Sequence, residues 1–386
     1  MADFTFSVRP RISLGPDTLL RLPLLAGEYA GSASPRALLV VDPLLSESKT
    51  IDRVRSLLED RGVQVLLFDE LPDRATSRAA DDALRLARGA RAPLVIGLGG
   101  LKTLMVARAV AAVAPSRLDI DAVLDGQTTG CPSLPLIEIP TSLRHGFMTD
   151  ESFFLVDGRD RRVRLVRSPG SGPVAVLVDP NLSASLSPKL ASTCVLAGLM
   201  GAVESYVSAR SSFMSDLLLE RAVSSLAKAL DILVARPDDP TARVEAWRGA
   251  FLASVGQGLS APGIGTALSL AINARYPVPK SSLAAILLPY SMESASKSRL
   301  EKVAALLPLL GEEADGMPDG EAAAKSVEWL RTRLGVLKIP SRLKDFDLSL
   351  DRLVETARDA RELDFVNYLP RAVSVEDVFD FVKTAF

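Results

Sequence analysis

The first half of the chain alternates short apolar runs with segments whose apolar positions follow a helical spacing. The runs predict strands at 37–41, 63–68, 93–96 and 134–139, and the spaced segments predict helices at 48–61, 77–90 and 102–113. Such alternation is typical of a parallel sheet with helices on both faces. Ligands of these sheets bind at the carboxyl ends of the strands. Asp42, the glycine turn at 97–100 and the loop at 140–146 occupy such ends.

The pattern changes beyond residue 187. Residues 151–185 form extended segments, whereas the following segments have a helical period: 187–209, 212–235, 240–259, 264–274, 281–296, 298–309, 320–334, 348–361 and 374–386. Ser374, followed by acidic residues, is typical of a helix cap. We therefore predict a Rossmann-like α/β domain of nucleotide-binding type at 1–185 and an all-helical domain at 186–386. The cleft between two such domains is the expected ligand site.

Composition narrows the class of protein. The 386 residues are 48% hydrophobic, and 45 basic against 47 acidic side chains leave a net charge of −2, without a basic field for nucleic acid. No uninterrupted apolar stretch of 18 residues predicts a membrane span, and the first residues lack a signal-peptide core. Two cysteines, Cys131 and Cys194, suit a reducing cytoplasm. The single histidine, His145, excludes sites built from several imidazoles.

Six segments, in this order and spacing, resemble one family: FTFSVRPRISLGPDTL (4–19), LPLIEIPTS (134–142), VAVLVDPNLSASLSP (174–188), AVESYVS (202–208), YPVPKSSLAAILLPY (276–290) and NYLPRAVSVEDV (367–378). The chain is similar over nearly its whole length to the iron-containing alcohol dehydrogenase superfamily. That superfamily includes glycerol dehydrogenase, maleylacetate reductase and, more remotely, dehydroquinate synthase. The resemblance implies a dehydroquinate synthase-like fold and a homodimer.

The resemblance also shows where this chain departs from the family. The family holds its metal with one Asp and three His, and these ligands fall at Ala197, Gly201, Thr266 and Lys280. A further active-site histidine of the family falls at Leu270. Three of these residues are small or neutral, and the fourth is a cation that would repel a divalent ion, so the resemblance implies a protein without the metal. A zinc site from Cys131, Cys194 and His145 would offer three ligands where structural zinc takes four.

The cofactor motifs are partly kept. The family's GGGS turn reads Gly99-Gly100-Leu101-Lys102, with Met105 at the position of a family Asp, and Leu101 adds bulk where a phosphate would approach. The resemblance implies NAD or NADP. The expected contacts are Asp42 to the ribose, Gly97, Gly99, Gly100 and Lys102 to the pyrophosphate, and Thr141 and Ser142 in the adjoining loop. Asp42 could instead cap a turn, and the glycines could serve the turn alone.

Five residues are candidates for the chemical step: His145, Arg144, Lys280, Arg275 and Glu204. His145 and Arg144 lie in the loop expected to face the ligand, and Lys280 replaces a metal ligand. Lys280 could polarise a carbonyl, act as an acid or base, neutralise Glu204, or point to solvent. Glu204 could instead anchor its helix through an ion pair, which is the role we favour for it. Arg275 could bind an anion or belong to a surface loop.

Three functions follow. The first, which we prefer, is a metal-independent oxidoreductase acting with NAD(P) on a small carbonyl or alcohol. The second is a repurposed scaffold that catalyses elimination, cyclisation or decarboxylation of an anionic substrate in specialised biosynthesis. The third is a non-catalytic homologue that serves as a partner protein. Cofactor binding separates the first from the others.

Overall fold

The computed structural model describes residues 9–31, 34–143, 146–184, 186–237 and 239–386. The described residues divide into two compact units. Residues 9–142 and 147–184 form the α/β unit, and residues 186–386 together with Leu143 and Gly146 form the helical unit. Each unit is described by itself below.

Parallel strands form the centre of the α/β unit. Among the described residues, one sheet has the order β1-β8-β5-β4-β2-β3 with all neighbours parallel. Its strands are β1 (Arg11–Leu14), β2 (Arg36–Val41), β3 (Gln64–Phe68), β4 (Val95–Gly99), β5 (Leu136–Pro140) and β8 (Ala175–Val178). The central strands β2, β4 and β5 are almost wholly buried, which is why they read as continuous apolar runs. The predicted parallel sheet is confirmed.

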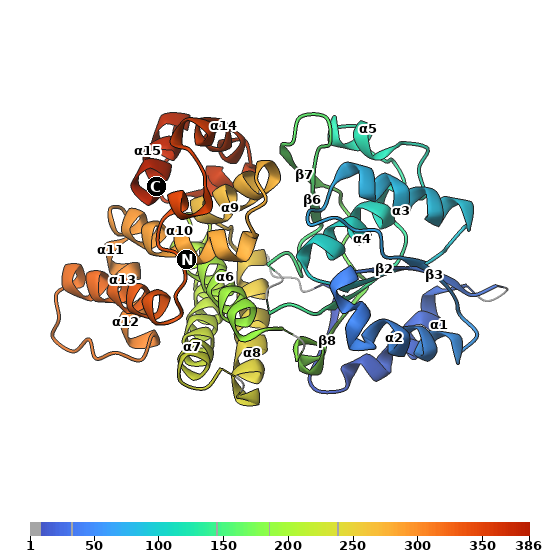
Figure 1. Cartoon of the computed structure of the whole chain (residues 1–386), viewed down its shortest axis with the longest axis horizontal. Helices are drawn as coiled ribbons and strands as arrows, with labels where there is room; N and C mark the ends of the chain where they lie inside the picture. The colour runs from blue at the N-terminus through green and yellow to red at the C-terminus, as the bar shows by residue number, and fades with distance from the viewer. Residues whose placement is uncertain (1–8, 32–33, 144–145, 185, 238) are drawn as a thin grey trace. The chain divides into compact units, whose positions relative to one another are not determined.

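Helices cover both faces of this sheet (Figure 1). α1 (Leu22–Tyr29) and α2 (Thr50–Glu59) lie on one side, and α3 (Ser77–Gly89) and α4 (Leu101–Val113) lie on the other. α5 (Ile120–Leu124) and the antiparallel hairpin β6 (Ser152–Val156) and β7 (Val163–Arg167) complete the unit. The helices change face because each connection between parallel strands is right-handed. The connection from β2 to β3 runs in one direction along the sheet, and the connections from β3 to β4 and from β4 to β5 run in the opposite direction.

A buried ion pair joins α4 to the sheet. The guanidinium of Arg108 donates to both carboxylate oxygens of Glu138 at 2.6 and 3.0 Å, and it also donates to the carbonyls of Asp150 and Ser152. Arg108 and Glu138 are 1% and 0% exposed. Buried charges persist only when they are paired and hydrogen-bonded in this way. The pair fixes α4, β5 and β6 relative to one another.

The helical unit is built around α6 (Pro188–Val207), which is buried along nearly its whole length. This helix is apolar and long enough to cross a membrane, but 94% of its apolar stretch is buried inside the protein, as in a core helix. The surrounding helices are α7 (Phe213–Ala235), α8 (Pro240–Gly258), α9 (Ile264–Arg275), α10 (Lys280–Ser296), α11 (Leu300–Ala304), α12 (Leu306–Leu309), α13 (Asp319–Val336), α14 (Leu350–Arg361) and α15 (Val375–Ala385).

The helical unit follows the sequence pattern closely, with one informative difference. Ser374 caps α15 in a capping box with Asp377, as its sequence predicts. The prediction of a single helix at 298–309 is wrong, because the structure has two short helices, α11 and α12, separated at Ala305. Pro308 has no N–H to donate to the carbonyl of Ala304, so a continuous helix loses a hydrogen bond there. The short helices α1 and α5 had no clear periodicity and were not predicted.

Candidate functional site

The order of the strands creates a switch point between β2 and β4. The chain passes from β2 outward to β3 and then returns to β4 on the other side of β2. In doubly wound sheets, ligands bind in the crevice outside the carboxyl ends of the strands at such a point. β2 ends at Val41 and β4 ends at Gly99. Asp42 and the Gly99-Gly100 turn therefore lie where this fold binds its ligands.

Glycine is required at position 99. Gly99 has a φ of +156°, and a Cβ there would lie 2.7 Å from Thr103 Oγ1 and 2.8 Å from the Cβ of Asp42. No larger side chain fits this approach. Gly97 has a packing role instead, because a Cβ there would lie 3.0 Å from the side chain of Ala107 on α4.

The predicted loop residues meet this turn. The backbone N–H of Thr141 donates to the carbonyl of Gly99 at 3.0 Å. A Cβ at Gly100 would lie 3.7 Å from Ser142 Oγ and 3.8 Å from Asp42 Oδ2. The structure thus brings Asp42, Gly99, Gly100, Thr141 and Ser142 together in one place.

Lys102 joins the same cluster through Asp42. Its Nζ lies 3.4 Å from Asp42 Oδ1, and both side chains are largely buried. Asp42 also accepts a hydrogen bond from the backbone N–H of Leu44 and thereby caps the following turn. The sequence left the ribose contact and the cap as alternatives for Asp42, and the structure shows the cap together with an ion pair to Lys102.

These residues fit the phosphates of a dinucleotide. α4 begins directly after Gly100, which offers no side chain to cap the first N–H groups of the helix. Uncapped N–H groups and the helix dipole favour an anion at that end. Among the residues that the structure describes, Thr103 Oγ1 is a buried hydroxyl without a hydrogen-bond partner beside the same turn. Leu101, whose bulk was expected to hinder the approach of a phosphate, is 7% exposed.

In the helical unit, Glu204 is the most densely bonded candidate. Its carboxylate accepts hydrogen bonds from the N–H groups of Gly263, Gly265 and Thr266, from Thr266 Oγ1 at 2.6 Å, and from Ser291 Oγ at 3.1 Å. Glu204 is 4% exposed. Burial raises the pKa of this carboxyl, and the hydrogen bonds from Thr266 and the two glycines oppose that rise. These partners are uncharged, so Glu204 anchors the start of α9 without the ion pair that its sequence suggested.

Of the two family metal positions on α6, the one at Gly201 lies beside the side chain of another helix. Gln257 of α8 donates from Nε2 to the carbonyl of Gly146 at 2.7 Å. A Cβ at Gly201 would lie 3.0 Å from Gln257 Oε1, and one at Gly146 would lie 2.9 Å from Nε2. Ala197, Gly201, Gly146 and Gln257 border a cavity of about 10 Å³, which is room for about one water molecule.

The other two family metal positions also carry unsuitable groups. The hydroxyl of Thr266 donates to Glu204, and the ammonium of Lys280 donates to Asn273 Oδ1 at 3.2 Å. Together with Ala197 and Gly201, they form a donor set that does not fit iron or zinc, which need anionic or neutral lone-pair ligands. Within the described part of the chain, no three His, Cys, Asp or Glu side chains gather around a possible metal.

The remaining candidate residues do not come together in one place within the described part of the chain. Arg275 donates to Asp359 Oδ2 at 2.6 Å and is tied into the helical unit by this ion pair. Leu270 is buried at 2% exposure. Arg144 and His145 lie outside the described residues. Gln257 was not a candidate in the sequence, because nothing local to it indicates that it would occupy the space beside Gly201.

Comparison with known proteins agrees with this geometry. Residues 10–180 match the family described as iron-containing alcohol dehydrogenase, and residues 191–386 match the C-terminal domain of the Fe-containing alcohol dehydrogenase family. The long-chain-alcohol dehydrogenase 1 of Geobacillus thermodenitrificans is 26% identical over 87% of this chain and 85% of its own length. The NAD-dependent methanol dehydrogenase of Bacillus methanolicus is 21% identical over 91% of this chain and 92% of its own.

The fold is shared with solved structures as well. A crystal structure of 1,3-propanediol oxidoreductase superposes with a TM-score of 0.92 at 20% identity, covering 100% of both chains. The two family matches together span nearly the whole sequence. This chain, with its parallel sheet, its glycine turn and its helical unit, belongs to the iron-containing alcohol dehydrogenase superfamily.

Proposed function

We propose that the protein is a metal-independent oxidoreductase that interconverts a small carbonyl compound and its alcohol with NAD or NADP. Membership of an alcohol dehydrogenase family supports the oxidoreductase class. The observation that carries the cofactor is the convergence of Asp42, Gly99, Gly100, Lys102 and Ser142 at the switch point of the sheet. The donor set at the four family metal positions supports catalysis without the metal.

The cofactor-binding residues have distinct tasks in this proposal. The N–H groups that follow Gly100 bind the pyrophosphate, and Lys102 adds a cation next to it. Asp42 then exchanges its contact with Lys102 for the ribose hydroxyls. When bound, a reduced nicotinamide supplies a hydride to the carbonyl carbon of the substrate.

In this proposal Lys280 replaces the metal as the group that stabilises and protonates the carbonyl oxygen of the substrate. It is the first residue of α10, and the helix has no side-chain cap at that end. Negative charge that develops on a carbonyl oxygen would be stabilised by this ammonium and by the positive end of the helix dipole. Lys280 therefore donates a proton to that oxygen, while Asn273, held by its own bond to the carbonyl of Val278, orients the ammonium.

Titration calorimetry of protein stripped of metal with a chelator tests the cofactor directly. We expect micromolar binding of NADH or NADPH, and we expect metal-stripped protein to reduce aldehydes or ketones. Two variants at the cap of α4 sharpen the test. Gly100→Asp and Gly100→Ser both introduce favoured N-cap residues, so both should fold. Only the aspartate places a negative charge against the pyrophosphate, and it should weaken binding at least about a hundredfold more than the serine.

Two results would overturn the proposal. No binding of either dinucleotide at millimolar concentration would leave the non-redox scaffold or the non-catalytic partner as the function. Binding that Gly100→Asp leaves unchanged would mean that the dinucleotide binds elsewhere. The homodimer, the cytoplasmic location and the small-molecule substrate stay predictions, and sedimentation velocity would test the first of these.

A further inference from the structure

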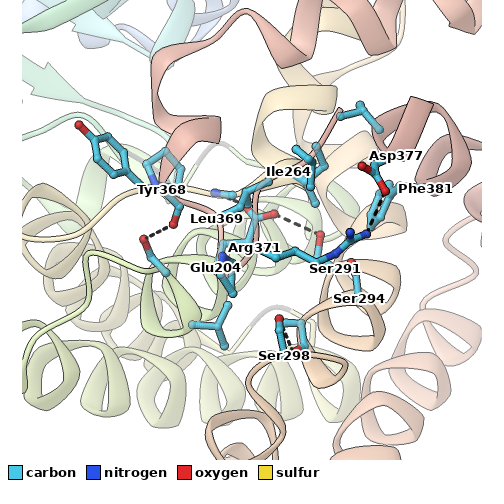
Figure 2. A pocket seen from close by; sticks show the side chains of 18 residues that line it. Glu204, Ile264, Ser291, Ser294, Ser298, Tyr368, Leu369, Arg371, Asp377 and Phe381 are labelled. Atoms are coloured by element: carbon cyan, nitrogen blue, oxygen red, sulfur yellow. Dashed lines mark hydrogen bonds and ion pairs between the residues drawn. The ribbon is translucent and has the colours of Figure 1, made fainter. Parts of the chain in front are cut away.

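The helical unit contains a second pocket, of about 60 Å³, that includes none of the four family metal positions among its lining residues (Figure 2). The pocket lies beside the C-terminal turns of α6 and the first turn of α9, and α10, α15 and the segment before α15 complete its wall. It is partly open to solvent. Its position makes it a candidate site separate from the one described above.

Most of the wall is apolar. Val207, Ile264, Leu369, Val373, Val378 and Phe381 contribute aliphatic and aromatic surface. Binding of an apolar body here would remove that surface from water at about 25 cal/mol per Å². Pockets that are largely apolar with a few convergent polar groups are typical of small-molecule sites.

Two serine hydroxyls belong to the polar part of the wall. Ser294 lies on α10, and Ser298 lies just beyond the end of this helix at Ser296. Ser298 Oγ lies 3.5 Å from the carbonyl of Ala295, at the outer limit of a hydrogen bond. Serine hydroxyls both donate and accept, so they match a hydroxyl or a carbonyl on a ligand.

The charges of the wall indicate an uncharged ligand. Arg371 donates to Asp377 Oδ1 at 3.2 Å, and Figure 2 shows this pair at the edge of the pocket. An anion would face two carboxylates, those of Asp377 and Glu204, against one guanidinium that is already paired. A cation would find the oxygens of Glu204 already engaged by Gly263, Gly265, Thr266 and Ser291.

Glu204 connects the pocket to the predicted active site. Its carboxylate forms part of the wall and also holds the first turn of α9, which carries Thr266. Glycine at positions 263 and 265 leaves room for this carboxylate, because a Cβ at either position would lie only 2.8–2.9 Å from it. A ligand in the pocket would therefore touch Glu204 and the start of α9 at the same time.

We propose that this pocket binds a small uncharged molecule with an apolar body and one hydroxyl or carbonyl group, and that its binding stabilises the start of α9 through Glu204. The proposal does not depend on the proposed oxidoreductase function. It assigns a second ligand site to the helical unit.

Phenol is the probe that tests this site. It is uncharged at pH 7 because its pKa is about 10, and it has no carbinol hydrogen that the proposed oxidoreductase could remove. We expect calorimetry to give one site with a dissociation constant below about 1 mM. We also expect hydrogen exchange in a peptide covering residues 262–270 to slow at least about twofold when phenol binds.

Variants of one helix provide the control. Ser294→Trp fills the pocket and should weaken phenol binding at least about tenfold, which is about 1.4 kcal/mol. Ser296→Trp, on the same helix, adds the same bulk at a residue outside the pocket and should leave binding unchanged. If Ser294→Trp does not fold, Val373→Trp fills the pocket from the segment before α15.

Three results would overturn the proposal. The site would be excluded if calorimetry detected no phenol binding with a dissociation constant below about 1 mM, which is the weakest affinity expected. Equal binding by the wild type and by Ser294→Trp would place phenol elsewhere. Binding that leaves exchange at 262–270 unchanged would remove the connection through Glu204.

Discussion

The hydroxyl of Thr266 donates to the carboxylate of Glu204 across 2.6 Å, and this bond links α9 to α6. Thr266 stands at a position where relatives in the family are expected to hold a metal. In this chain the same position is used to fasten two helices through a buried carboxylate. The link is completed by Gly263, Gly265 and Ser291, so that α10 is joined as well.

Replacement of Glu204 by Gln should destabilise the protein by about 1–3 kcal/mol at neutral pH. The amide keeps the shape of the side chain but turns an N–H toward the N–H groups of α9, which then lack an acceptor. Chemical denaturation of wild type and Glu204→Gln measures the difference. Equal stability of the two proteins would show that the start of α9 does not need this carboxylate.

The raised pKa of Glu204 also predicts a pH dependence. Because burial raises its pKa in the folded protein, the folded state binds the proton more tightly than the unfolded state, whose ordinary value is 4.5. The stabilising contribution of the protonated form is therefore present below this value and lost as the pH rises above it. The stability of wild type relative to Glu204→Gln should therefore fall as the pH rises above about 4.5. A difference that is flat or grows with pH would contradict the direction of this shift, and Glu301→Gln on the surface of α11 serves as a control.

Gln257 should hold the loop at Gly146 in place. Gln257→Leu keeps most of the volume but leaves the carbonyl of Gly146 without its partner, at a cost of about 1–2 kcal/mol. We expect faster tryptic cleavage after Arg144, detected by mass spectrometry, because Gly146 loses the hydrogen bond that holds it to α8. Cleavage after the exposed Lys338, which follows α13 in the same unit, is the internal control. Unchanged cleavage after Arg144 would argue against this role.

The two glycines before α4 should respond differently to a methyl group. Gly99→Ala places a Cβ within 2.9 Å of Thr103 and Asp42 at a φ of +156°, and it should destabilise the protein by about 1–3 kcal/mol. Gly100→Ala meets only ordinary contacts of 3.7 and 3.8 Å, and it should cost about 1 kcal/mol or less as a poorer N-cap. Thermal denaturation of both variants checks the order. A more harmful change at Gly100 would contradict the geometry of the turn.

Lys280→Ala should lower kcat/KM for carbonyl reduction at least about tenfold, since it removes the proposed proton donor. Lys297→Ala, at the other end of α10, should keep the wild-type rate. His145→Ala should also lower the rate at least about tenfold if His145 acts on the substrate. Steady-state kinetics on metal-stripped protein measures all three variants, and a wild-type rate in Lys280→Ala would remove Lys280 from the site.

The sequence by itself determined the type of fold and most of its helices and strands. Continuous apolar runs can form only buried strands or buried helices, and their alternation with amphipathic segments left the parallel sheet as the consistent arrangement. The ends of the strands then located Asp42 and the glycine turn, because ligand position in this fold depends on strand direction and not on particular side-chain contacts. The break at Ala305 was missed, since one proline within an apolar segment changes the hydrogen bonding without changing the periodicity.

Only the tertiary structure decided which side chains meet. Gln257 and Gly201 are far apart in the sequence, and no local pattern connects the amide of one to the missing side chain of the other. Glu204 likewise gave no sign that its partners would be the N–H groups of a helix 59 or more residues away. Lys102 was expected to meet a phosphate, and the fold brings it to Asp42. Periodicity reports which residues are buried, whereas the partners of buried polar groups depend on how the helices pack, which single-residue patterns do not encode.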